Sequence, residues 1–75
     1  MKTFSEKLQE LRRREGLSQE QLADQLGVTR QSVSKWESGA ASPELSKLIA
    51  LSDLFGISID YLVKDHLEEP RLPLW

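Results

Sequence analysis

Four polar side chains recur at helical spacing within residues 30–38: Arg30, Gln31, Ser34 and Lys35. Ser34 lies one turn beyond Arg30 and Lys35 one turn beyond Gln31, so in a helix they share one face. An arginine can donate two hydrogen bonds to guanine O6 and N7, and a glutamine can pair with adenine N6 and N7. These side chains are therefore predicted to read base edges in the DNA major groove. The alternative is that they form the solvated face of an ordinary amphipathic helix.

A second group of residues flanks this face and is suited to phosphate. The candidate phosphate contacts are Gln19, Thr29, Ser32, Ser38 and Gly39. Gln19 opens an expected helix, where backbone N–H groups and a polar side chain can meet an anion. The alternative interpretation is that Gln19 is an ordinary polar residue in the first turn of that helix. Gly39 permits close approach of the backbone to a phosphate, and Thr29 is also a good N-cap.

The turn before residues 30–38 must position these side chains. Gly27 follows Leu26 where a left-handed residue can end a helix at low cost. Ala23, one turn earlier, is small enough to let two crossing helices approach. The buried side of the pair is expected to comprise Leu22, Leu26, Val33 and Trp36. This order of small residue, glycine and bulky apolar residues predicts a helix-turn-helix formed by residues 19–27 and 30–38.

The remaining helix start and stop signals predict an all-α chain with five helices. The first covers residues 3–15 and opens with a capping box between Thr3 and Glu6. The fourth is expected to start at 42–44, with Ser42 as its cap and Pro43 in its first turn. Gly56 stops it, and a short fifth helix follows Ser58 with Ile59 and Val63 facing inward. No stretch of the sequence alternates in the manner of a strand.

Size and composition limit the function. A chain of 75 residues makes one small domain, assigned here to residues 1–66, and it contains no cysteine and a single histidine, His66. We expect no metal, no cofactor, no membrane span and no enzymatic activity, and a cytoplasmic location at the nucleoid of a bacterial or phage-encoded system. The net charge of −2 is uneven, because residues 1–39 sum to +1 (7 basic, 6 acidic) and residues 40–75 to −3 (3 basic, 6 acidic).

Residues 67–75 form an acidic, proline-containing tail that differs from the rest. Two prolines prevent a regular helix there, while Leu72, Leu74 and Trp75 are apolar. One interpretation is a frayed end or a clipped linker. The other is that the tail docks into a groove, either on its own body or on a second copy.

Three segments resemble the phage-repressor and Cro-type helix-turn-helix proteins, also called the XRE family. They are LSQEQLA at 17–23, LGVTRQSVSKWESG at 26–39 and LIALSDLFGIS at 48–58. The resemblance implies a compact, lambda-repressor-like five-helix domain that binds operator DNA, usually as a two-fold homodimer. The function expected of the chain is that of a sequence-specific transcriptional regulator, more often a repressor. The resemblance also implies a structural salt bridge between Arg12 and Glu37, and it places the base readers at the four positions named first.

A second function remains open beside DNA binding. The apolar Leu72, Leu74 and Trp75 could bind a protein partner, as in an antitoxin-like interaction module. The net negative charge does not oppose this alternative, and the two functions can coexist in one chain.

Overall fold

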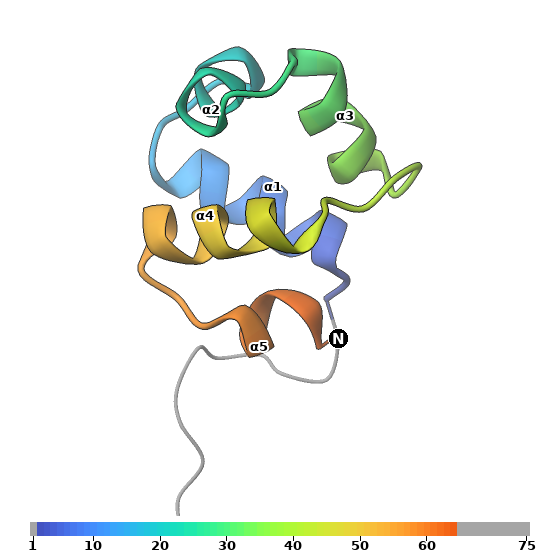
Figure 1. Cartoon of the computed structure of the whole chain (residues 1–75), viewed down its shortest axis with the longest axis vertical. Coiled ribbons are helices and arrows are strands. Elements are labelled where there is room, and N and C mark those ends of the chain that lie inside the picture. The colour runs from blue at the N-terminus through green and yellow to red at the C-terminus, as the bar shows by residue number, and fades with distance from the viewer. Residues whose placement is uncertain (1, 65–75) are drawn as a thin grey trace, which may run out of the picture.

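The computed structural model describes residues 2–64, and over this range the chain is all helical with no strand. The helices are α1 (Phe4–Arg14), α2 (Gln19–Leu26), α3 (Arg30–Ser38), α4 (Leu45–Phe55) and α5 (Ile59–Val63). Helices α2 and α3 form one end of the molecule, α5 lies at the other end beside the first part of α1, and α1 and α4 run between them (Figure 1). The prediction of an all-α, five-helix fold is confirmed. The tail and His66 lie outside the described residues.

Side-chain caps set most of the helix starts. Thr3 and Glu6 make the expected capping box of α1, and Ser18 makes the same arrangement with Gln21 at α2. Thr29 caps α3 by accepting a hydrogen bond from the backbone N–H of Ser32. Each cap satisfies an N–H group that has no partner inside its helix.

The predicted start of α4 is wrong. The helix begins at Leu45, and its N-cap is Glu44, which makes no side-chain capping bond. Ser42 and Pro43 therefore lie in the loop before the helix, and Pro43 is buried. Proline suits a first turn, but it is equally suited to a loop that must bury an apolar ring without a backbone donor.

The core joins all five helices. Its buried apolar side chains are Leu8, Leu11, Leu22, Ala23, Leu26, Val33, Trp36, Leu51, Tyr61 and Leu62. Trp36 is only 6% exposed, which confirms its predicted place in the core. The inward position expected for Val63 is wrong, because this side chain is 45% exposed while Leu62 beside it is fully buried. A helix as short as α5 buries one narrow side, and Tyr61 and Leu62 occupy it.

Lys7 is the unexpected member of the interior. It is fully buried, and its ammonium donates to the backbone carbonyls of Tyr61 (2.6 Å) and Lys64 (2.5 Å). The ammonium also lies 4.6 Å from the centre of the Tyr61 ring, a cation–π distance. Carbonyls at a helix C-terminus lack helical partners and carry partial negative charge, so a cation is favourable there. Lys7 thus fastens the end of α5 to α1.

Replacing Lys7 by methionine is expected to lower the free energy of unfolding by about 2 kcal/mol, because two carbonyls lose a charged donor while the stem packing is retained. Urea unfolding followed by circular dichroism measures the loss. Arg13→Ala, at an exposed position of the same helix, is the control and should change stability by less than about 0.5 kcal/mol. Equal effects of the two substitutions would contradict the fastening role.

Candidate nucleic-acid interface

Helix α3 has two chemically different sides. Val33, Trp36 and Glu37 are buried on one side. The four predicted base readers lie elsewhere on the helix: Arg30, Gln31 and Lys35 are exposed and Ser34 is half-buried. The structure therefore exposes three of these side chains to solvent, and Ser34 in part. A helix of this kind matches the size of the DNA major groove.

The turn between α2 and α3 explains how this helix is presented. Gly27 ends α2 with φ +69° and ψ 33°, a left-handed conformation that other residues adopt only at a cost. Its N–H group and that of Val28 bond back to carbonyls of Asp24 and Ala23, at 3.3 and 3.0 Å. Ala23 is 2% exposed at the crossing, so the helices meet with a small residue between them.

The candidate phosphate contacts form the border of this surface. Thr29 is exposed, and its hydroxyl lies 3.1 Å from that of Ser32, which is half-buried. At the other end of α3, Ser38 donates its hydroxyl to the carbonyl of Lys35, and exposed Gly39 turns the chain at φ +84°. Thr29 and Ser38 each retain a solvent-facing position beside a backbone turn. Their contact with phosphate stays a prediction.

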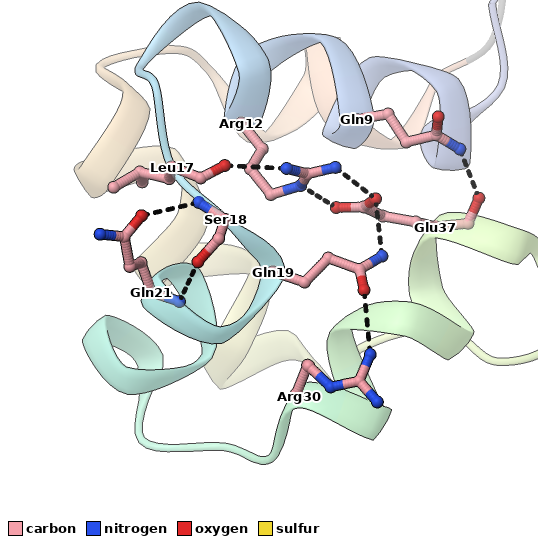
Figure 2. Close-up of polar contacts among 8 residues, drawn as sticks. All are labelled: Gln9, Arg12, Leu17, Ser18, Gln19, Gln21, Arg30 and Glu37. Carbon is pink, nitrogen blue, oxygen red and sulfur yellow. Dashed lines mark hydrogen bonds and ion pairs between the residues drawn. The ribbon is translucent and has the colours of Figure 1, made fainter.

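Glu37 is the polar centre behind the reading face. Its carboxylate receives two hydrogen bonds from the Arg12 guanidinium: Nε to Oε2 at 2.7 Å, and Nη2 to Oε1 at 3.1 Å (Figure 2). The two side chains are 13% and 5% exposed, so this predicted ion pair is present and largely removed from water. The third guanidinium nitrogen of Arg12 donates to the carbonyl of Leu17, 2.8 Å away, in the loop before α2. One arginine therefore joins α1, the α1–α2 loop and α3.

Gln19 extends this arrangement toward the surface. Its Nε2 donates to Glu37 Oε1 at 3.2 Å, which fixes the amide so that Oε1 points the other way, toward Arg30 (Figure 2). Arg30 Nη1 approaches that oxygen at 3.5 Å, the outer limit of a hydrogen bond. The side chain expected to meet phosphate is thus already engaged within the protein. What it presents toward Arg30 is an acceptor.

Two residues that hold this region, Gln9 and Lys47, were not predicted from the sequence. Gln9 Nε2 donates to the backbone carbonyl of Glu37 at 2.8 Å, a contact from α1 to the last turn of α3. Lys47 of α4 donates to the carbonyl of Leu26 at 3.0 Å, at the C-terminal end of α2. Both contacts satisfy carbonyls near a helix end. Nothing in the spacing of Gln9 or Lys47 marks them, because their partners are 28 and 21 residues away.

Among residues 2–64, no group of three His, Cys, Asp or Glu side chains is placed to hold a metal ion. Within the same range, no helix has both the length and the apolar character that a membrane crossing requires.

Neutralising Glu37 is expected to destabilise the domain by about 3 kcal/mol, because Glu37→Gln leaves the guanidinium of Arg12 buried without its counter-charge. Chemical denaturation measures this change. Glu20→Gln, at an exposed position of the first turn of α2, is the matched control and should have little effect. A loss below about 1 kcal/mol for Glu37→Gln would show that the ion pair is dispensable.

Comparison with known proteins supplies independent information on this architecture. The helix-turn-helix family model matches residues 8–62. The HTH-type transcriptional activator BcrR of Enterococcus faecalis is 50% identical over 60 residues, 80% of this chain and 29% of that protein. The SPbeta prophage-derived uncharacterized regulator YonR of Bacillus subtilis (strain 168) is 46% identical over 61 residues, 81% of this chain and 56% of that protein. The chain therefore spans less than two thirds of the length of both relatives.

A solved structure agrees with the fold. The P22 c2 repressor, determined in complex with a synthetic operator, superposes with a TM-score of 0.81 at 29% identity, covering 87% of this chain and 98% of that one. The lambda-repressor-like arrangement implied by the sequence is thus confirmed. With a family model that extends from α1 into α5, the chain belongs to the helix-turn-helix family of the XRE type.

Proposed function

We propose that this chain is the DNA-binding part of a transcriptional regulator and recognises a specific double-stranded sequence with α3. The observation that carries the proposal is the polar side of α3, where Arg30, Gln31 and Lys35 are exposed while Glu37 of the same helix is held in a largely buried ion pair with Arg12. A reading helix must hold its side chains in fixed positions, because bidentate bonds to bases tolerate little displacement.

The assignment of roles follows from chemistry and position. Arg30 and Gln31 occupy the first turn of α3, the part of a recognition helix that reaches base edges. Lys35, one turn later, can bond to a base or to a phosphate. Ser34 lies between Gln31 and Lys35 in the sequence and is proposed to contact a base. Thr29, Ser32, Ser38 and Gly39, with the N-terminus of α2 at Gln19, are proposed to contact phosphates on either side.

The small number of basic residues in α2 and α3 limits the affinity for DNA of any sequence. Arg30 and Lys35 are the only basic residues within α3, and α2 has none, so few phosphates can be neutralised there. Since released counterions supply most of the non-specific affinity for DNA, we expect weak non-specific binding and a specific affinity that depends on base contacts.

Replacing Arg30 and Gln31 by alanine, singly, is expected to weaken binding to the preferred operator about 10- to 100-fold and to relax base preference at one position each. Fluorescence anisotropy with operator variants measures both quantities. Gln25→Ala, an exposed glutamine near the other end of α2, is the control and should bind as the unmodified chain does. Unchanged affinity and preference in both variants would exclude α3 as the reader.

We further propose that two copies act together as a repressor, by occluding a promoter. The P22 c2 protein is a repressor seen with operator DNA, whereas BcrR is an activator, so the relatives' names alone support a regulator of either sign. A two-fold dimer presents two α3 helices to half-sites on one side of the duplex.

Selection from a random duplex library at physiological salt tests the dimer. The bound fraction is expected to contain an inverted repeat with half-sites about 10–10.5 base pairs apart, centre to centre. A library with one base pair inserted between the half-sites is the control and should bind more weakly. Enrichment of a single, unrepeated site would support specific DNA binding and contradict the homodimer.

A further inference from the structure

A small apolar pocket opens where the start of α1, the loop between α3 and α4, α4 itself and the end of α5 meet. It is lined by Phe4, Ser42, Pro43, Leu48 and Val63 and has a volume of about 150 Å³. Four of its five lining residues are apolar. One of them, Val63, is the last residue of α5 and is 45% exposed. A cavity of this volume lined by apolar side chains is large enough to take one aromatic ring.

The chain leaves α5 beside this pocket. Lys7 holds the carbonyls of Tyr61 and Lys64. Val63 lies between these two residues, so its position at the pocket edge is fixed from both sides. Lys64 has an extended backbone, with φ −103° and ψ 115°, which ends the helix. The last described residue of the chain is therefore held beside the pocket.

The segment that follows α5, residues 65–75, is long enough to reach the pocket and contains apolar residues that could fill it. Eleven residues, 65–75, can span up to about 36 Å when extended. They include Leu72, Leu74 and Trp75, and Pro70 and Pro73 reduce the conformational freedom that docking would remove.

We propose that the Trp75 side chain docks in this pocket of its own molecule, against Leu48 and Val63. A tether of this length gives an effective concentration in the millimolar range, which favours the molecule's own pocket over that of a second copy at micromolar concentration. Docking covers the exposed Val63 side chain. None of the residues that line the pocket is among those proposed to contact DNA.

Trp75 fluorescence tests the contact, because the spectrum of the Trp75→Phe variant, which retains buried Trp36, can be subtracted from that of the 75-residue chain. The remaining emission is expected to be shifted to shorter wavelength than that of free tryptophan and to be protected from quenching by iodide. Emission and quenching equal to those of free tryptophan would overturn the proposal without any further variant.

Two substitutions at matched exposure locate the contact. Val63→Lys puts a charge at the pocket edge and is expected to shift Trp75 emission to longer wavelength and restore quenching. Ile49→Lys changes a residue of α4 that is 44% exposed and is absent from the pocket lining, so it should leave Trp75 protected. Circular dichroism verifies that each variant is folded. Protection that survives Val63→Lys in a folded chain would place Trp75 elsewhere and overturn the proposal.

Dilution identifies the occupant. Protection that is unchanged between about 100 μM and about 1 μM supports docking within one molecule. Protection that disappears on dilution would assign the pocket to the tail of a second copy and contradict the proposal. A tail that is exposed at every concentration, and becomes protected only when another protein is added, would contradict it in favour of a partner-binding tail. None of these outcomes depends on whether the chain binds DNA.

Discussion

The buried carboxylate of Glu37 determines how α1, α2 and α3 meet. A charge with a side chain only 5% exposed has to be paired and hydrogen-bonded, because its desolvation would otherwise oppose folding by several kcal/mol. Its partners are Arg12 from α1 and Gln19 from α2, while Gln9 of α1 binds the carbonyl of the same residue. Satisfying one buried charge therefore fixes the position of α3 against two other helices. The exposed side chains of α3 are held in position because Glu37, on the buried side of the same helix, is bonded to α1 and α2.

The sequence predicted the local features well, because their causes are local. The caps at Thr3, Ser18 and Thr29 act within three residues, and the left-handed conformation of Gly27 follows from the lack of a side chain at a turn. The Arg12–Glu37 pair was predicted for a different reason, since it came from resemblance to a family. Spacing alone gives no means of pairing residues 25 positions apart.

The failures have physical causes as well. Ser42 and Pro43 carry the features of a helix start, but burial of the proline in the loop outweighs capping, so α4 begins at Leu45. Lys7 was overlooked although it occupies the position three after Phe4 and four before Leu11, on the apolar stripe of α1. A lysine on such a stripe is usually an exposed interruption, and only the tertiary fold supplies the two carbonyls that make its burial favourable. The roles of the α3 residues toward DNA depend on a bound duplex, so they stay predictions.

The burial of Lys7 also has a consequence for chemical modification. Acylation of a lysine requires that the enzyme or reagent reach the amine, and this amine is enclosed by α1 and α5 whenever both are in place. It becomes available only through local opening of the α5 end, a motion whose free-energy cost can be much smaller than that of global unfolding. An acyl group on Lys7 would then prevent closure, because the neutral amide has lost two donors and gained bulk. The accessibility of the Lys7 amine is therefore tied to how often the α5 end of the domain opens.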